Sequence, residues 1–377
     1  MNPAERLRLF LSNRLAGLAL SGLVLALGLI AYVVQPIASL VLLGLGGLML
    51  IGALVSFTLE RNLPAAPGKL FSIDGQRVHL LAEGEAGESY PVIWVAGGHG
   101  EGLIMHHLHK AMRKETRSLL FDRTGSGWTG PATRPVTISG EVEQLKRLLN
   151  TAGEQGPFVL AGHSFGGLFS ANFAHHYPDL VAGVVLLDST PPWNVAFAGK
   201  LSFGPVLRKA WWGALASHFG LQRLVEPEID DPESALARQL ADVAGTVNAH
   251  SVQPKSLLAE ASVFKSCMDN PLDLVIGKGA LGDIPLLLMS AHPTESEQRE
   301  LREQLTGMLG LSRLQADNLV EGLRDSNGQQ LALSTQSRHH LMPEGASHMF
   351  PYEYPETVLE AVREMTRKAG SEPAPAG

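Results

Sequence analysis

Cysteine is nearly absent from this 377-residue chain, and so is any excess of positive charge. The single cysteine, Cys267, excludes an internal disulfide framework and a cysteine-rich zinc site, and we expect it to be a small buried or half-buried side chain. The net charge of −7, without a basic stripe interleaved with aromatics, gives no general attraction to nucleic acid. Nucleic acid is therefore not an expected partner. The length allows one large α/β domain with appendages, or two ordinary domains.

Charge is also missing from a long stretch near the N-terminus. No charged side chain occurs between Arg14 and Glu60, and a Gln-Pro pair alone interrupts the apolar sequence. The two halves, about residues 15–34 and 37–59, are each long enough to cross a hydrocarbon core as a helix. Buried core helices are rarely apolar on every face for so long, and a signal peptide has a shorter apolar region. We expect residues 1–62 to form a membrane anchor of two transmembrane helices, whose glycines allow close packing.

Basic residues flank this apolar stretch on both sides. Arg6, Arg8 and Arg14 precede it, Arg61 and Lys69 follow it, and the short turn between the halves carries none. Because positive residues stay on the cytoplasmic side, both ends should face the cytoplasm. We expect a multi-pass protein of a bacterial inner membrane, with the rest of the chain on the cytoplasmic face, where few disulfides form.

Beyond a proline-rich linker at residues 63–68, strand-like and helix-like segments alternate, as in an α/β sheet. We expect a globular domain at residues 69–369 and a disordered tail at 370–377. The strand pattern is missing from about 189 to 283, which predicts an inserted helical cap, and 295–325 is a polar helical extension. The expected strands are residues 71–73, 78–82, 92–96, 117–121, 158–161, 181–187, 284–289 and 339–342, and the expected helices are 141–150, 168–174 and 355–367.

One motif indicates a serine nucleophile. The sequence Gly162-His163-Ser164-Phe165-Gly166-Gly167 follows an apolar run and precedes a helical pattern. This G-x-S-x-G pattern puts a serine hydroxyl at the apex of a sharp strand-to-helix turn. Neighbours without a Cβ leave room for the strained serine backbone. The alternative is a glycine-rich turn without chemistry, because such matches also arise by chance.

Six segments follow one another along the chain: the hairpin at 71–83, the glycine loop after Ala96, residues 121–128, the Ser164 turn, Leu187-Asp188 and residues 345–348. Their order gives the chain, over about residues 71–369, a resemblance to the α/β-hydrolases. The resemblance implies a mainly parallel sheet with helices on both faces, and catalytic groups on loops at the carboxyl ends of its strands. It also implies a serine esterase of the carboxylesterase or lipase type.

A serine nucleophile needs a base, and histidine accepts and returns a proton near neutral pH. His348 lies in a small-residue loop after the final strand, where the resemblance places the base. The family's usual acid position, after strand 284–289, holds no aspartate. Certain haloalkane dehalogenases place the acid directly after the strand that follows the nucleophile helix, and Asp188 occupies that position. We expect Asp188 as the acid, with Glu295 or a purely capping Asp188 as alternatives, and we expect His163 to point away.

Acyl transfer also needs donors aimed at the oxyanion. The resemblance assigns one to the backbone N–H of Phe165 and the other to the loop after strand 92–96. Gly98 is the expected residue there, and His99 stays open as the alternative. We also expect His99 and Trp193 to contact the substrate.

Two further groups have two interpretations each. Trp211, Trp212 and Phe219 either line an acyl pocket or pack the cap's own core. The histidines of residues 106–109 have the spacing of metal ligands but lack neighbouring carboxylates or cysteines. We expect a solvated helix there and no metal.

The predicted reaction is hydrolysis of an ester or thioester through an acyl-enzyme on Ser164, without a cofactor. A serine nucleophile argues against dehalogenase or epoxide hydrolase chemistry, which uses a carboxylate. The predicted anchor and apolar cap favour lipid-like substrates. The competing hypotheses are a membrane-tethered acyltransferase and an inactive scaffold of the same fold.

Overall fold

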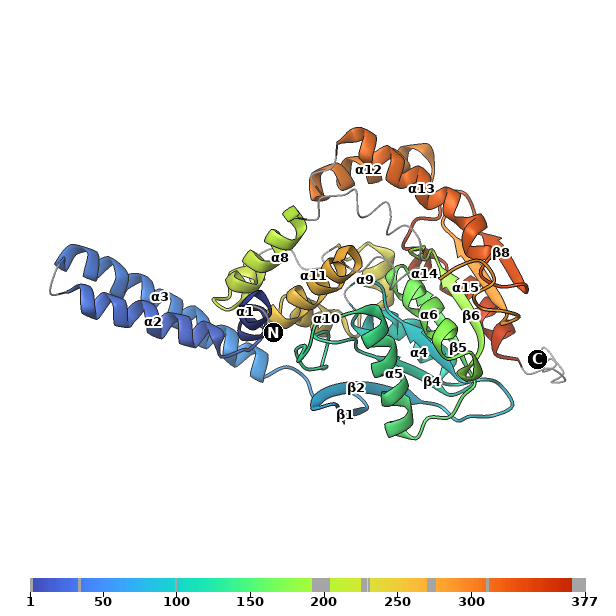
Figure 1. Cartoon of the computed structure of the whole chain (residues 1–377), viewed down its shortest axis with the longest axis horizontal. Helices are drawn as coiled ribbons and strands as arrows, with labels where there is room; N and C mark the ends of the chain where they lie inside the picture. Colours follow the sequence, from blue (N-terminus) through green and yellow to red (C-terminus); the bar gives the residue numbers. More distant parts are fainter. Residues whose placement is uncertain are drawn as a thin grey trace.

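A two-helix arm and an α/β body make up the computed structural model (Figure 1). In the arm, α2 (Ala16–Ala31) and α3 (Pro36–Arg61) pack side by side and project from the body. A short helix, α1 (Pro3–Leu11), lies at the base of the arm. The structure describes residues 3–32, 35–98, 100–191, 204–224, 229, 231–269, 276–309 and 312–367.

Within the described residues, the body is built on one eight-stranded sheet with the order β1-β2-β4-β3-β5-β6-β7-β8. The pairs β1–β2 and β2–β4 are antiparallel, and all other pairs are parallel. Every expected strand is present, and the predicted α/β-hydrolase architecture is confirmed. The strands are β1 (Lys69–Ile73), β2 (Gln76–Glu83), β3 (Val92–Val95), β4 (Ser118–Phe121), β5 (Phe158–His163), β6 (Val181–Leu187), β7 (Leu286–Ser290) and β8 (Ser337–Leu341).

Helices cover both faces of the sheet, which explains why its strands are continuously apolar. Ile93 and Val95 of β3 belong to the core that includes α5 and α6, whereas Val92 and Trp94 belong to the core that includes α4 and α15. All four side chains are fully buried. These helices are α4 (His106–Met112), α5 (Ile138–Ala152), α6 (Phe165–His176) and α15 (Pro355–Thr366).

Local signals set the ends of α5. The Thr137 hydroxyl accepts a hydrogen bond from the Gly140 amide, which caps the N-terminus. Gly153 ends the helix with a φ of 76°, a left-handed conformation that suits glycine. The helix is therefore longer at both ends than the amphipathic pattern at 141–150 predicts.

Further helices are inserted on either side of β7. The segment before β7, where we expect a cap, contains α8 (Gly204–Ser217), η3 (Leu221–Leu224), α9 (Ala235–Gln239), α10 (Ala244–Ser251) and α11 (Pro254–Asp269). The polar stretch after β7 forms two helices, α12 (Glu295–Leu309) and α13 (Arg313–Leu331). The domain limits stay a prediction, and the predicted tail at 370–377 lies outside the described residues.

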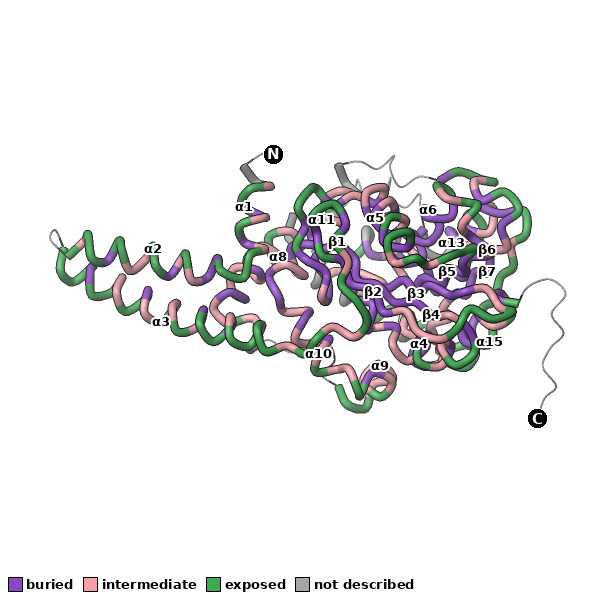
Figure 2. Tube along the Cα trace, turned by 90° about the horizontal axis from the view of Figure 1, so that it is seen from below, coloured by how far each residue is buried: buried purple, intermediate pink, exposed green. Residues whose placement is uncertain are grey.

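The arm contains one helix that is long and apolar enough to cross a membrane by itself. That helix is α3, and 17% of its most apolar segment is buried. With 16 residues, α2 is shorter and meets the same test only together with α1, from which it is bent by 98°. Figure 2 shows mainly exposed and half-buried residues along the arm. One spanning helix is therefore supported among the described residues, and the expected second span stays a prediction.

Candidate active site

Ser164 lies in a strained turn between β5 and α6. Its φ of 53° and ψ of −122° are unusual for a residue with a side chain. A Cβ added at Gly162 would lie 2.3 Å from the Gly166 carbonyl oxygen, and one added at Gly166 would lie 2.1 Å from that of Val95. Real Cβ atoms do not approach this closely, so the turn requires glycine at both positions. The surrounding structure thereby holds the strained serine in place.

An acid and a base meet at the carboxyl ends of the parallel strands. His163 and Leu187 are register partners, so Ser164 and Asp188 both leave neighbouring strands at the same edge of the sheet. The Asp188 Oδ2 accepts a hydrogen bond of 2.6 Å from Nδ1 of His348. Asp188 and His348, both predicted site residues, are therefore in direct contact.

The environment of Asp188 keeps its carboxylate ionised. Burial acts to raise its pKa, but the hydrogen bond and attraction to His348, together with the Ala291 amide, outweigh burial and hold the pKa of Asp188 below its usual value. An ionised carboxylate bound to Nδ1–H leaves a lone pair on Nε2 of His348. The imidazole is 48% exposed, so a substrate can reach it. The alternative acid, Glu295, is an exposed residue in the first turn of α12.

The loop that follows β3 lies against the Ser164 turn. Val95 pairs in register with Gly162, and a Cβ added at Gly97 would lie 3.4 Å from the Ser164 Cβ. Gly98 is the next residue of this loop. Phe165 is the first residue of α6, and the first amides of a helix have no partner within it. Both proposed oxyanion donors thus come from segments beside Ser164, whereas His99 and Trp193, the expected substrate contacts, lie outside the described residues.

Arg123 holds the same loop, and no function was predicted for it from the sequence. Its guanidinium donates hydrogen bonds to the carbonyls of Ala96, Gly97 and Gly98, at 2.9 Å for Ala96 and 2.8 Å for Gly98. It also lies 5.0 Å from the centre of the Phe165 ring. Because three successive carbonyls point at Arg123, the loop is fixed in one orientation. Arg123 belongs to residues 121–128, one of the segments that carry the resemblance, but a position in this segment does not by itself indicate a function.

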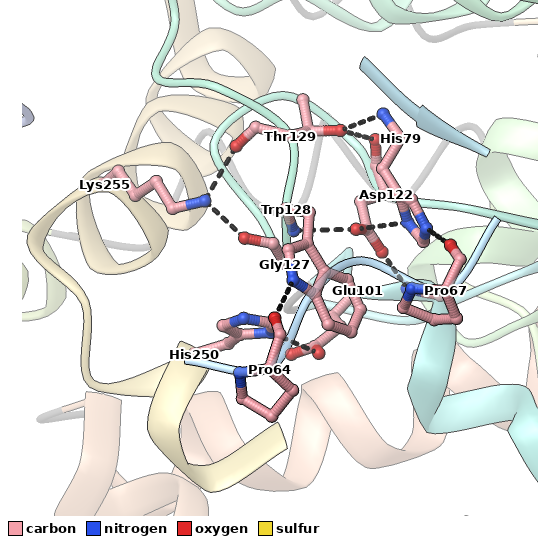
Figure 3. A network of polar contacts seen from close by, with 11 residues as sticks. Pro64, Pro67, His79, Glu101, Asp122, Gly127, Trp128, Thr129, His250 and Lys255 are labelled. Atoms are coloured by element: carbon pink, nitrogen blue, oxygen red, sulfur yellow. Dashed lines mark hydrogen bonds and ion pairs between the residues drawn. The ribbon is translucent and has the colours of Figure 1, made fainter. Parts of the chain in front are cut away.

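A buried polar network secures the other end of this loop (Figure 3). Asp122 accepts hydrogen bonds from the Gly102 amide (2.8 Å), the Trp128 amide (2.9 Å) and Nδ1 of His79 (2.8 Å). Although burial acts to raise it, the pKa of Asp122 is lowered by the contact with His79 and by the two amides. The Trp128 indole N–H donates to the carbonyl of Pro64 in the linker. The Asp122 carboxylate therefore joins the loop after β3 to β2, and Trp128 extends this connection to the linker.

The inserted helices are tied to the same network (Figure 3). On α10, His250 is in contact with Glu101 at 2.7 Å. On α11, the Lys255 ammonium donates to the carbonyls of Gly127 and Thr129. Burial lowers the pKa of Lys255 to about 8. These contacts hold the helices that precede β7 against the loops that carry the site.

His163 does not point away from the site, so that expectation is wrong. Its Nε2 donates a 2.9 Å hydrogen bond to the carbonyl oxygen of His348, and the two rings lie 4.7 Å apart. Burial, with the neighbouring His348, lowers the pKa of His163 to about 3. A neutral imidazole is compatible with this geometry because its Nδ1 needs no proton. His163 thus holds the loop that carries His348.

The histidines of residues 106–109 do not form a solvated helix face. His109 is fully buried, between the Ser118 hydroxyl and Glu83, each at 2.9 Å. Burial lowers its pKa to about 4. Among the described residues, no group of three histidine, cysteine or acidic side chains is placed to hold a metal ion.

The surroundings of Trp211 distinguish between its two interpretations. A cavity of about 430 Å³ is lined by Leu7 of α1, Trp211 of α8 and Leu258 of α11, and none of its lining residues belongs to the Ser164 turn. Trp211 also packs beside the core formed by α1, α8 and α11. Trp212 is 69% exposed. Packing within the cap is therefore the better interpretation for Trp211. Trp212 is mainly exposed to solvent and does not share this packing.

Comparisons with known proteins agree with this geometry. The family described as alpha/beta hydrolase fold matches residues 90–224. A thermophilic esterase from Thermogutta terrifontis has a TM-score of 0.53 and 21% identity, covering 82% of this chain and 97% of that chain. The Bacillus subtilis protein YbdG is 24% identical over 175 residues, which are 46% of this chain and 53% of YbdG. The Mycobacterium tuberculosis lipase LipV is 36% identical over 111 residues, 29% of this chain and 41% of LipV. The chain spans about half the length of the curated relatives it matches.

Proposed function

We propose that this chain, which has the α/β-hydrolase fold, is a membrane-anchored serine hydrolase that cleaves a carboxylic ester or thioester through an acyl-enzyme on Ser164. The observation that carries this proposal is the 2.6 Å contact of Asp188 with His348 at the strand end where Ser164 leaves the sheet. The names of similar proteins, an esterase and a lipase, support ester bonds as the target.

The proposed mechanism uses the described groups in two half-reactions. Nε2 of His348 takes the proton of the Ser164 hydroxyl as its oxygen attacks the acyl carbonyl. The amides of Phe165 and Gly98 hold the oxyanion, and His348 gives its proton to the departing alcohol or thiol. Water then attacks the acyl-enzyme while His348 takes its proton, and His348 returns that proton to the Ser164 oxygen as the bond between this oxygen and the acyl group breaks and the acid leaves. Throughout, Asp188 orients the imidazole and stabilises its protonated form.

The membrane anchor is supported by the dimensions and surface of the arm. With 26 residues, α3 is about 39 Å long, which exceeds the ~30 Å of a hydrocarbon core. Its exposed side chains include Leu40, Leu48 and Ile51. Arg14 and Arg61 lie at the end of the arm nearest the body, so the body belongs on the cytoplasmic face. Esters that dissolve in the membrane are the substrates that such an enzyme meets.

Hydrolysis of nitrophenyl esters with short, medium and long acyl chains tests this function, with the full-length protein in detergent micelles. We expect Ser164→Ala to lower kcat by a factor on the order of 10⁴ or more, since the nucleophile is lost. Ser296→Ala, an exposed serine of α12, is the control. Equal activity of wild type and Ser164→Ala would refute the proposal. An added primary alcohol that captures most of the acyl group would identify an acyltransferase instead.

A further inference from the structure

Exposed apolar side chains gather at one place outside the arm. We call residues 212–224, the end of α8 and the following turn, the cap tip. Six large apolar side chains beyond Arg61 are exposed among the described residues, and three of them belong to the cap tip. They are Trp212, Leu221 and Leu224, with exposures of 69%, 55% and 83%.

The cap tip touches the arm through backbone atoms. The Ser56 hydroxyl of α3 donates a 3.1 Å hydrogen bond to the Ser217 carbonyl. A Cβ added at Gly52 would lie 2.5 Å from the Phe219 carbonyl oxygen, so the two backbones meet where α3 has no side chain. This contact needs two particular residues of α3, which lie one helical turn apart. Glycine at position 52 leaves room for the Phe219 carbonyl, and the Ser56 hydroxyl binds the Ser217 carbonyl.

A second contact fixes the cap tip to the base of the arm. His218 is 3% exposed, and its Nε2 lies 2.7 Å from the carbonyl oxygen of Leu11, the last residue of α1. A Cβ added at Gly17 of α2 would lie 2.9 Å from the Cβ of His218. The cap tip is therefore held between the corner of α1 and α2 on one side and α3 on the other.

The length of α3 sets the depth of the cap tip relative to a bilayer. A hydrocarbon core of ~30 Å takes up about 20 helical residues. If it begins at the start of α3, Pro36, it ends near Ser56. Gly52 and Ser56, the residues that touch the cap tip, lie at this boundary. The exposed side chains of the cap tip are thereby placed where hydrocarbon gives way to headgroups.

The composition of this segment matches that boundary. Residues 204–224 contain no aspartate or glutamate but include Arg208, Lys209 and Arg223. Arg208 and Lys209 are exposed. Tryptophan is favoured at the membrane interface, and cationic side chains beside it attract anionic headgroups.

We propose that the cap tip is a separate membrane-contacting element, in which Trp212, Leu221 and Leu224 insert into the leaflet that the arm enters, next to anionic lipid headgroups. This inference rests on the membrane anchor of the proposed function and adds a lipid surface as the partner of the cap. The proposed contact would hold the helices that precede β7 at the surface of the membrane, in which long-chain esters dissolve.

Site-directed fluorescence tests the proposal on the full-length protein. Cys267→Ala removes the only cysteine, and Leu224→Cys then carries an environment-sensitive fluorophore. The protein is placed in vesicles of phosphatidylcholine and phosphatidylglycerol with spin-labelled lipid as quencher. Leu314→Cys on α13, 70% exposed, is the matched control, and Leu48→Cys on α3, 69% exposed, reports the anchor. We expect a blue shift and quenching at positions 224 and 48, and neither at 314.

The outcomes separate this proposal from the anchor. Quenching at position 48 with a water-like spectrum at 224 would overturn the proposal and leave the anchor standing. A water-like spectrum at position 48 would overturn the anchor and the proposal together. Leu221→Cys provides a second position if Leu224→Cys does not fold, and is expected to be quenched as well. Replacing phosphatidylglycerol by phosphatidylcholine should weaken quenching at 224 and leave it unchanged at 48.

Discussion

Asp188→Asn changes one atom of the contact on which the catalytic proposal depends. In the folded protein, Asp188 Oδ2 accepts the Nδ1–H of His348 at 2.6 Å, and Oδ1 accepts the Ala291 amide at 3.0 Å. Asparagine keeps the second bond with its carbonyl oxygen, which turns its NH₂ group toward His348. An NH₂ donor favours the tautomer with the proton on Nε2. That imidazole cannot accept the proton of Ser164.

The size of the effect follows from the loss of both tautomer and charge. The same substitution in a serine protease triad lowers kcat by ~10⁴, which corresponds to about 5.5 kcal/mol of activation free energy. Asp188 is ionised and hydrogen-bonded to its histidine in the same way, so we expect a loss on the order of 10³ to 10⁴ in kcat. KM should change little, because the substituted atom does not bind the acyl group.

Steady-state ester hydrolysis by wild type, Asp188→Asn and Glu295→Gln provides the assay. Glu295 is exposed in α12, so its amide variant should keep near-normal kcat. Thermal midpoints in detergent confirm that both variants are folded. A near-normal kcat for Asp188→Asn would refute the assignment, and a large loss for Glu295→Gln would transfer the role to that residue.

Three other predictions follow from the described geometry. Gly166→Ala should destabilise the fold by about 1–3 kcal/mol, because the new Cβ meets the Val95 carbonyl oxygen; an unchanged thermal midpoint would contradict the tight turn. Arg123→Gln should lower kcat with little change in KM, because the carbonyls around Gly98 lose the guanidinium that orients the oxyanion loop; a rise in KM alone would argue against this role. Burial lowers the pKa of His107 from 6.5 to about 4, so the unfolded chain binds a proton there that the folded protein does not. Stability from this group is fully present above about pH 6.5 and falls by up to about 1.4 kcal/mol per pH unit as the pH drops toward 4. The thermal midpoints of wild type and His107→Phe should converge as the pH falls across this range. Parallel profiles would contradict the lowered pKa of His107.

Local sequence patterns predicted the parts of the fold that depend on local physics. The strands were predictable because a parallel sheet buried on both faces needs continuous apolar runs, such as Val181–Leu187. The Ser164 turn was predictable because its strain requires glycine neighbours at fixed spacing. The ends of α5 were not, since Thr137 and Gly153 act as caps outside the apolar pattern.

Long-range contacts explain what the sequence did not reveal. His163 bonds to a carbonyl 185 residues away, which no local pattern encodes. Arg123 binds three backbone carbonyls. Because every residue has a backbone carbonyl, the sequence does not indicate which ones a distant arginine will bind. His109 is buried through contacts with β2 and β4, although its own helix looks polar. From the sequence, Asp188 and Glu295 were both candidates for the acid, and the 2.6 Å contact of Asp188 with His348 is the reason for proposing Asp188.

Covalent labelling by a fluorophosphonate tests the proposed serine hydrolase most directly. The full-length protein in micelles is treated with the probe, digested, and analysed by mass spectrometry for the modified peptide. We predict one adduct on Ser164 in the wild type, no adduct in Ser164→Ala, and much slower labelling in His348→Gln. Folded wild-type protein that stays unlabelled, or that carries its adduct on a different serine, would contradict Ser164 as the nucleophile.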